Sequence, residues 1–227
     1  MFFDPMYLIM LVPGLVLAVI AQMMVKTAFA KYSQVQSYSG LTGAQAAERM
    51  LRGSGVFDVS VEQVQGFLSD HYDPSRKVLR LSPQVYQSRS LAAVGIACHE
   101  AGHALQHAEG YAPLALRTAL VPVTSISSNF AFYVFALGMA FQSRMMVLVG
   151  CGMFAVAFVF ALVTLPVEWD ASARAKRHIV AAGVVSPSQE RDTAKVLDAA
   201  FLTYVAGAVA SLMTLLYYLM RANGRRR

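Results

Sequence analysis

The sequence predicts a mainly α-helical multi-pass membrane protein, in which four transmembrane helices accompany a small α+β domain. Of its 227 residues, 56% are hydrophobic and only 14% are charged, whereas a soluble domain usually carries about 25% charged residues. Residues 7–24, 119–142, 145–167 and 201–220 contain no charged side chain. Each run has close to the roughly 20 residues that cross a bilayer core as a helix. Uncharged runs of this length favour membrane helices over the buried helices of a soluble bundle.

The first apolar run could instead be a cleaved signal peptide, because Ala28-Phe29-Ala30 has the small-x-small form of a cleavage site. However, no Lys or Arg precedes the run, Asp4 stands where a basic region would be, and Lys26 separates the run from the site. The sequence therefore favours an uncleaved membrane anchor.

The runs divide the chain into five parts. Residues 1–30 are expected to form the first transmembrane helix and its exit, and 31–118 a polar domain. Residues 119–167 would hold the second and third transmembrane helices, 168–200 a polar helix, and 201–227 the fourth transmembrane helix with a basic tail. With four crossings, the two polar parts lie on the same side of the membrane and can meet.

The polar domain has the pattern of a small α+β unit. Thr42 and Gln45 have the spacing of a capping box ahead of a helix. Alternation over 56–64 and a short apolar stretch at 77–81 predict strands, and 88–108 predicts a second helix.

Basic residues near the span ends predict that the polar parts face the cytoplasm. On the polar side these are Lys26, Lys31, Arg117, Arg174, Lys176, Arg177, Arg191 and Lys195. On the opposite side they are Arg144, Arg221, Arg225, Arg226 and Arg227. Eight against five follows the positive-inside rule. Membrane anchoring accounts for the net charge of +6, and no interleaved basic and aromatic surface indicates a nucleic-acid partner.

The stretch ACHEAGHALQH, residues 97–107, carries the pattern H-E-x-x-H. His99 and His103 are four residues apart, so a helix presents both imidazoles on one face, where Glu100 can also reach. A zinc ion held by two His and one carboxylate keeps a position open for water, whose pKa falls to about 7. Glu100 would accept a proton from that water and pass it to the leaving amine. His and Glu are costly in so apolar a helix unless they are satisfied, so the pattern predicts one zinc ion per chain.

The third zinc ligand is predicted to be Glu168, with Glu109 as the alternative. In one class of zinc peptidases the third ligand lies six residues after the second histidine, and a glycine three residues after that histidine turns the chain. Glu109 has the position of that ligand, but Gln106 stands in place of the glycine. Without the turn, the helix would carry Glu109 away. Glu168 follows Pro166, which can start a helix, and it lies in the second polar part.

Other candidate residues are interpreted as structural. Cys98 and Cys151 are the only cysteines, and Cys151 lies within a predicted span, so no disulfide is expected. Cys98 points away from His99 around the helix and is expected to be a small packed residue. His107 is expected to be a satisfied surface histidine, and His71 a turn residue.

Four stretches together resemble the YugP-type family of bacterial membrane zinc metallopeptidases. These are HYDPSRKVLRLSPQVY, HEAGHALQHAEGYAPLALR, LPVEWDASARA and LTYVAGAVASL. The resemblance covers about residues 38–217 and implies a neutral zinc protease of the gluzincin kind in the bacterial cytoplasmic membrane. It also implies that His99, His103 and Glu168 are the zinc ligands and that Glu100 is the catalytic base.

The chain departs from the broader gluzincin pattern, in which an Asp four residues after the ligand Glu orients a ligand His. Ser172 occupies that position here, and Asp170 lies two residues after Glu168. Either Ser172 or Asp170 could orient the ligands.

Substrate contacts are predicted more weakly. An extended peptide could add to an edge strand formed by Lys77, Val78, Leu79, Arg80 and Leu81. His178 and Tyr204 could stabilise an oxyanion, although a structural role is the simpler interpretation of each.

These inferences predict a membrane-embedded zinc endopeptidase with a gluzincin-like domain. Its substrates would be membrane-associated proteins or peptides, and its other partner the lipid bilayer. The alternative is a catalytically silent membrane scaffold that keeps zinc for folding.

Overall fold

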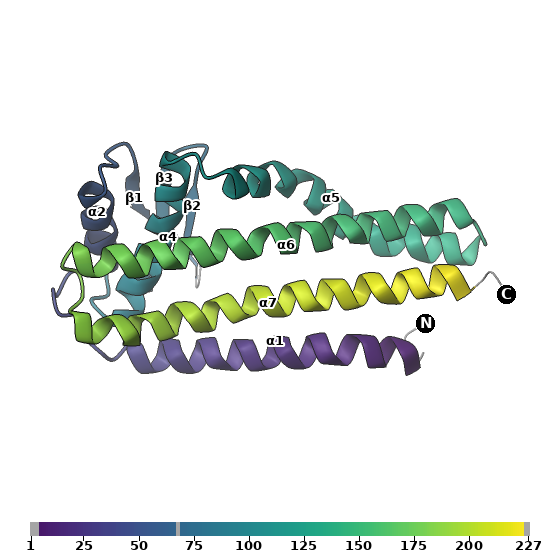
Figure 1. Cartoon of the computed structure of the whole chain (residues 1–227), viewed down its shortest axis with the longest axis horizontal. Helices are drawn as coiled ribbons and strands as arrows, with labels where there is room; N and C mark the ends of the chain where they lie inside the picture. The colour runs from purple at the N-terminus through teal and green to yellow at the C-terminus, as the bar shows by residue number, and fades with distance from the viewer. Residues whose placement is uncertain (1–4, 67–68, 225–227) are drawn as a thin grey trace. The chain divides into compact units, whose positions relative to one another are not determined.

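The computed structural model describes residues 5–66 and 69–224 and is mainly helical (Figure 1). The helices are α1 (Pro5–Tyr32), α2 (Gly43–Gly53), α3 (Pro83–Tyr86), α4 (Leu91–Ala108), α5 (Ala112–Ala140), α6 (Arg144–Ala181) and α7 (Pro187–Asn223). The strands are β1 (Ser60–Gln63), β2 (His71–Asp73) and β3 (Val78–Leu81). Asp4, used above to favour an uncleaved anchor, lies outside the described residues, as do the tail arginines used to predict orientation, Arg225, Arg226 and Arg227.

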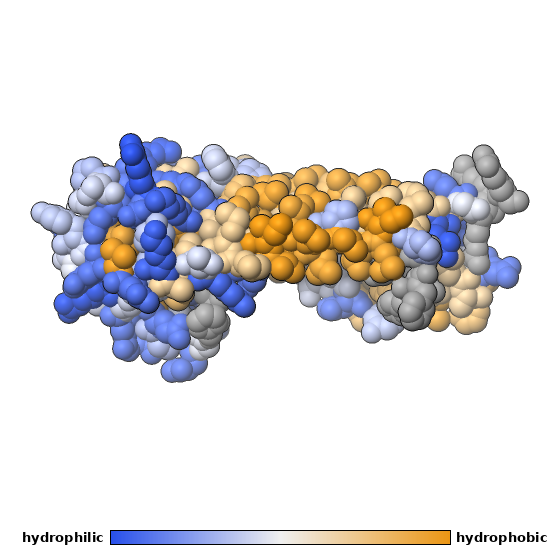
Figure 2. All heavy atoms as spheres, turned by 90° about the horizontal axis from the view of Figure 1, so that it is seen from below, coloured by the Kyte–Doolittle hydropathy of each residue, from blue (hydrophilic) through white to orange (hydrophobic). Residues whose placement is uncertain are grey.

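Four of the described helices are long and apolar enough to cross a membrane, as the uncharged runs predict. The candidate spans are Leu8–Tyr32, Ala112–Ala140, Arg144–Ala181 and Pro187–Asn223. Figure 2 shows hydrophobic side chains gathered along the long helices. Many large apolar side chains of these helices are exposed, among them Leu15, Ile126 and Leu148, and such residues suit contact with lipid.

Pro166 does not begin a helix, contrary to expectation, because α6 runs without interruption through Pro166. Proline is more frequent in transmembrane helices than in soluble ones. The third predicted span and Glu168 are therefore parts of one helix.

The chain divides into two compact units. One contains 1–21, 116–166 and 203–227, as far as these are described, and the other contains Gln22–Ala115 and Val167–Leu202. Nearly all of the predicted polar parts, 31–118 and 168–200, thus fall within the second unit.

Small residues bring helices close together in the first unit. A Cβ built on Gly14 would lie 2.9 Å from the Cα of Ala210, and one on Gly150 would lie 2.8 Å from the Cβ of Phe135. Association of membrane helices depends on such close packing, because lipid is as apolar as the side chains that it would replace. Phe135 is fully buried and contacts the ring of Tyr218.

The core of the second unit surrounds α4. Its apolar residues, including Leu91, Val94 and Ala97, are fully buried. Ser90 caps the helix by accepting a hydrogen bond from the amide of Ala93. The helix α2 packs against α4, and the capping box predicted for Thr42 and Gln45 is present.

The three strands form one sheet in the order β1-β3-β2, with β1 parallel and β2 antiparallel to β3. The strand predicted at 77–81 exists as β3, but the prediction that it is an edge strand is wrong. It lies in the centre and is paired on both sides, and its residues Leu79 and Leu81 are fully buried. Within the described part of the chain, β1 and β2 are the edges.

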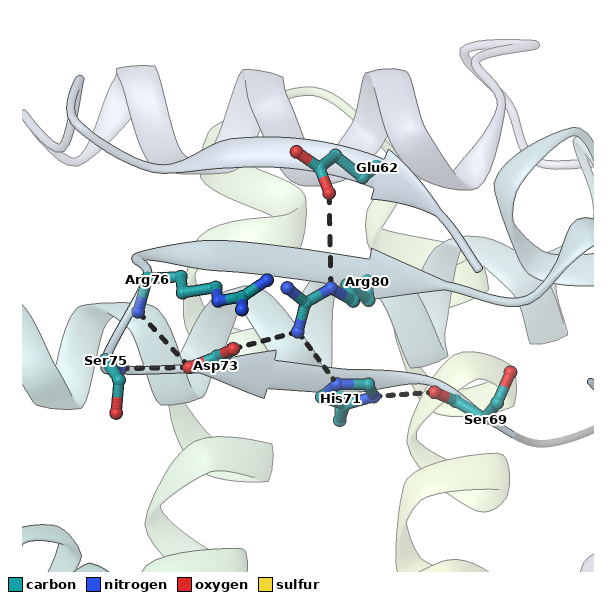
Figure 3. Close-up of polar contacts among 7 residues, drawn as sticks. All are labelled: Glu62, Ser69, His71, Asp73, Ser75, Arg76 and Arg80. Carbon is teal, nitrogen blue, oxygen red and sulfur yellow. Dashed lines mark hydrogen bonds and ion pairs between the residues drawn. The ribbon is translucent and has the colours of Figure 1, made fainter. Parts of the chain in front are cut away.

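Arg80 links all three strands on one face of the sheet (Figure 3). Its guanidinium lies 2.8 Å from Asp73 on β2 and 4.0 Å from Glu62 on β1, and it approaches Nε2 of His71 at 3.5 Å. His71 is the first residue of β2, so the prediction that it lies in a turn is wrong. A turn follows β2, where Asp73 accepts hydrogen bonds from the amides of Ser75 and Arg76.

Candidate metal centre

His99 and His103 on α4 meet Glu168 on α6. Oε2 of Glu168 lies 3.2 Å from Nε2 of His99 and 3.7 Å from Nε2 of His103. One ligand atom from each of the three residues lies within 4.8 Å of the others. The two segments are 69 residues apart in sequence, and the fold brings them together within the second unit.

The donor set fits a divalent metal ion. Glu168 is 1% exposed, and a buried carboxylate is costly unless it is paired or coordinates a metal. Two imidazoles and one carboxylate form a ligand set that zinc enzymes use. Burial opposes protonation of His103, but the hydrogen bond with Glu168 and the charge of Glu100 outweigh burial and raise the pKa of His103. A bound cation would offset the buried negative charge of Glu168 in the same way as a charged imidazole.

The close approach of α4 and α6 depends on Gly102. A Cβ at this position would lie 2.5 Å from the backbone oxygen of Ala171. Only glycine allows this contact between the helix that carries the two histidines and the helix that carries Glu168.

We expect Gly102→Ala to force α4 and α6 apart and to destabilise the fold by about 1–3 kcal/mol, the usual range for overpacking. Zinc affinity should fall as well, because the three candidate ligands come from these two helices. Thermal unfolding and zinc competition in lipid nanodiscs measure both effects. The matched control is Gly152→Ala in α6, where a Cβ meets nothing within 4 Å. Equal behaviour of the two variants would show that the helix contact is unimportant.

Each histidine also has a hydrogen-bond partner on the side away from Glu168. Nδ1 of His99 lies 3.1 Å from Oγ of Ser172, and Nδ1 of His103 lies 3.0 Å from Oε1 of Gln106. Asp170 reaches His103 only through Gln106, whose amide nitrogen lies 2.9 Å from Oδ2 of Asp170. Of the two candidates from the sequence, Ser172 contacts a predicted ligand directly, whereas Asp170 is connected to one only through Gln106.

Gln106 was not predicted to be a site residue, and from the sequence it was notable only because it stands where a turn glycine would be. The available signal was its position three residues after His103, inside an apolar helix where an amide needs hydrogen-bond partners.

Glu109, the alternative ligand, takes part in a different interaction. The helix α4 continues to Ala108, as the absence of a turn glycine predicted, and Glu109 caps its end. The carboxylate of Glu109 is 59% exposed and lies 2.6 Å from Nη1 of Arg174. Among the described residues, the carboxylate that lies with His99 and His103 in the candidate metal group is that of Glu168, not that of Glu109.

Glu100 is the residue of α4 that follows His99, and it is partly exposed. The negative charge of Glu100 helps to raise the pKa of His103. A carboxylate near the metal group that also reaches solvent is suited to exchange protons with water.

The remaining predicted residues have other surroundings. Nδ1 of His178 lies 3.2 Å from Oγ of Ser54, and Tyr204 belongs to the first unit, at 36% exposure. The hydroxyl of Tyr72 lies 2.8 Å from Nδ1 of His107, so His107 is satisfied as expected. Cys98 is fully buried, and burial raises the pKa of its thiol to about 12.

Four helices able to cross a membrane and a largely buried His-His-Glu group are the features of a membrane-associated zinc metallopeptidase. The chain belongs to the family described as "Putative neutral zinc metallopeptidase", which matches residues 7–223. It is 46% identical over 221 residues to the "Putative membrane protease YugP" of Bacillus subtilis (strain 168), covering 97% of this chain and 98% of that protein. The resemblance noted from the four motifs is therefore confirmed. No solved structure matches the chain.

Proposed function

We propose that the protein is a zinc-dependent endopeptidase that cleaves membrane-associated proteins or peptides. His99, His103 and Glu168 would hold one zinc ion, and Glu100 would act as the general base. The observation that carries the proposal is the convergence of two buried donor groups, His103 and Glu168, and the half-buried His99 beside a partly exposed carboxylate.

Bound zinc would supply a Lewis acid that acidifies water and polarises a peptide carbonyl. Glu100 would accept a proton from the attacking water and then donate it to the departing amine. Ser172 would hold the ring of His99, and Gln106 that of His103, because both hydrogen-bond the nitrogen that faces away from Glu168.

The position of Glu168 on α6 supports a site at the membrane surface. The uncharged run 145–167 would extend about 34 Å as a helix, slightly more than the roughly 30 Å hydrocarbon core. Glu168 follows this run directly. Trp169 comes next, is 60% exposed, and is of the residue type that collects at membrane interfaces. Substrates would therefore be cleaved close to the lipid headgroups.

An extended substrate would add to β2 rather than to β3. Within the described residues β2 is an edge of the sheet, and it is the strand whose Tyr72 contacts His107 on the zinc-motif helix. A peptide paired with β2 would lie beside α4, which carries two of the three proposed metal ligands.

We infer that the site faces the cytoplasm of a bacterial cell, from the excess of basic residues on the polar side. The variant Ser75→Cys tests this orientation, because Ser75 is exposed and both natural cysteines are buried. A membrane-impermeant maleimide should label it in lysed cells but not in intact cells. Labelling of intact cells would place the site on the outer face.

Chelation tests the proposed activity. Purified protein in nanodiscs should cleave an unfolded protein substrate, lose that activity with a zinc chelator, and recover it when zinc is restored. A silent scaffold would bind zinc and lose stability on chelation but would cleave nothing before or after. The two outcomes separate the endopeptidase from the alternative function.

A further inference from the structure

Gln106 is a fully buried amide beside the metal centre, on α4. Its Nε2 donates hydrogen bonds to the backbone oxygen of Val167 at 2.8 Å and to Oδ2 of Asp170 at 2.9 Å. Its Oε1 lies 3.0 Å from Nδ1 of His103. The side chain thus connects a predicted zinc ligand on α4 with two groups on α6.

The two partners on α6 determine which way the amide points. A backbone carbonyl and a carboxylate can only accept hydrogen bonds. If the amide were rotated by half a turn, its oxygen would face both of these acceptors. Asp170 is itself held by Arg174, which donates to Oδ2 through Nε. The oxygen of Gln106 must therefore face His103.

The orientation of the amide in turn determines the tautomer of His103. Because Oε1 of Gln106 can only accept, Nδ1 of the ring must carry the hydrogen. In the neutral ring the lone pair is then on Nε2, the nitrogen that faces Glu168 in the metal group.

We propose that Gln106, oriented by Asp170, is a positioning residue that keeps His103 in the tautomer able to bind zinc through Nε2. The proposal rests on the zinc site of the proposed function but does not require hydrolysis.

His99 provides an internal contrast. Its Nδ1 faces the hydroxyl of Ser172, and a hydroxyl can donate or accept. Ser172 therefore holds the ring of His99 without dictating its tautomer. Of these two rings, His103 is the one whose partner at Nδ1 permits a single arrangement.

Without the acceptor on Gln106, the neutral His103 ring is more stable with its hydrogen on Nε2, because it can then donate a hydrogen bond to the buried carboxylate of Glu168. Zinc would then have to displace that hydrogen before it could bind. Loss of such an orienting partner typically lowers metal affinity 10- to 100-fold.

The first test compares Gln106→Met with Gln87→Met in full-length protein in nanodiscs. Gln87 bonds to the amide of Gln63 in an exposed position, so the control makes the same chemical change outside the metal group. Competition with a chromogenic chelator should show zinc affinity about 10- to 100-fold weaker in Gln106→Met and unchanged in Gln87→Met. An affinity in Gln106→Met equal to that of the unaltered protein would overturn the proposal.

The second test observes the tautomer directly by nitrogen NMR of labelled histidine rings in metal-free protein, at a pH where the rings are neutral. In the unaltered protein Nδ1 of His103 should carry the hydrogen, and in Gln106→Met it should move to Nε2. The signals of His99 should not change. A purely structural role of Gln106 would leave the tautomer as it was, and that result would contradict the proposal.

A third test exchanges the amide of Gln106 and the carboxylate of Asp170, and it distinguishes the proposed role from simple misfolding. Gln106→Glu places a carboxylate against Asp170 and should weaken zinc binding. Adding Asp170→Asn supplies an amide donor to the new carboxylate, which can still accept from His103, so zinc affinity should partly recover. A double variant no better than Gln106→Glu alone would refute the orienting role of Asp170. Zinc binding without hydrolysis in the unaltered protein would instead reject the proposed function and leave this inference standing.

Discussion

Replacing Glu100 by glutamine should abolish peptide hydrolysis while the protein still binds one zinc ion per chain. The amide has the shape of the carboxylate but cannot accept a proton from water, and loss of a general base typically costs 10²- to 10⁴-fold in rate. Zinc should remain because its proposed ligands, His99, His103 and Glu168, are unchanged. Initial rates on an unfolded substrate, together with metal analysis of the same sample, measure both quantities.

Glu109→Gln is the matched control for this result. It makes the same change at an exposed carboxylate that pairs with Arg174 at the end of the same helix, and it should retain most of the activity. Full activity in Glu100→Gln would show that another group accepts the proton.

Replacing Glu168 by alanine should eliminate both zinc and hydrolysis. The carboxylate is nearly completely buried between the two imidazoles, so its removal leaves only two donors in the metal group. Metal content should fall from one equivalent toward zero, and hydrolysis to background. Glu168→Gln preserves the volume and should show the same loss, which separates lost ligation from a cavity.

Glu109→Ala distinguishes the two ligands considered from the sequence. If Glu168 completes the site, Glu109→Ala retains zinc. Retained stoichiometry in Glu168→Ala together with loss in Glu109→Ala would reverse the assignment.

Much of the molecule could be predicted because the signals are local. The uncharged runs locate the four candidate spans, since charge is too costly in lipid to occur there by accident. The helical spacing of His99 and His103 places both rings on one face of α4, and the missing turn glycine explains why α4 carries Glu109 past the site. The juxtaposition of Glu168 with the histidines needed only the further inference that both polar parts share a side of the membrane.

The features that were predicted wrongly or not predicted depend on contacts between residues far apart in the sequence. The strand β3 is central because β1 pairs with it in parallel, and a parallel partner leaves no turn signal in the sequence. Pro166 lies inside a helix because the effect of a proline depends on its surroundings. The role of Gln106 depends on Val167 and Asp170 of another helix, so no pattern within α4 alone could have indicated its orientation.

Under the proposed function, the uninterrupted course of α6 through Pro166 affects how the activity could be regulated. A fragment containing only residues 31–118 would keep His99, Glu100 and His103 but would leave behind the carboxylate of Glu168. Proteolytic shedding of that fragment would release an inert polypeptide rather than a soluble protease. Under the proposed function, catalysis is therefore confined to molecules that remain inserted, and their turnover in the bilayer limits how long the activity persists.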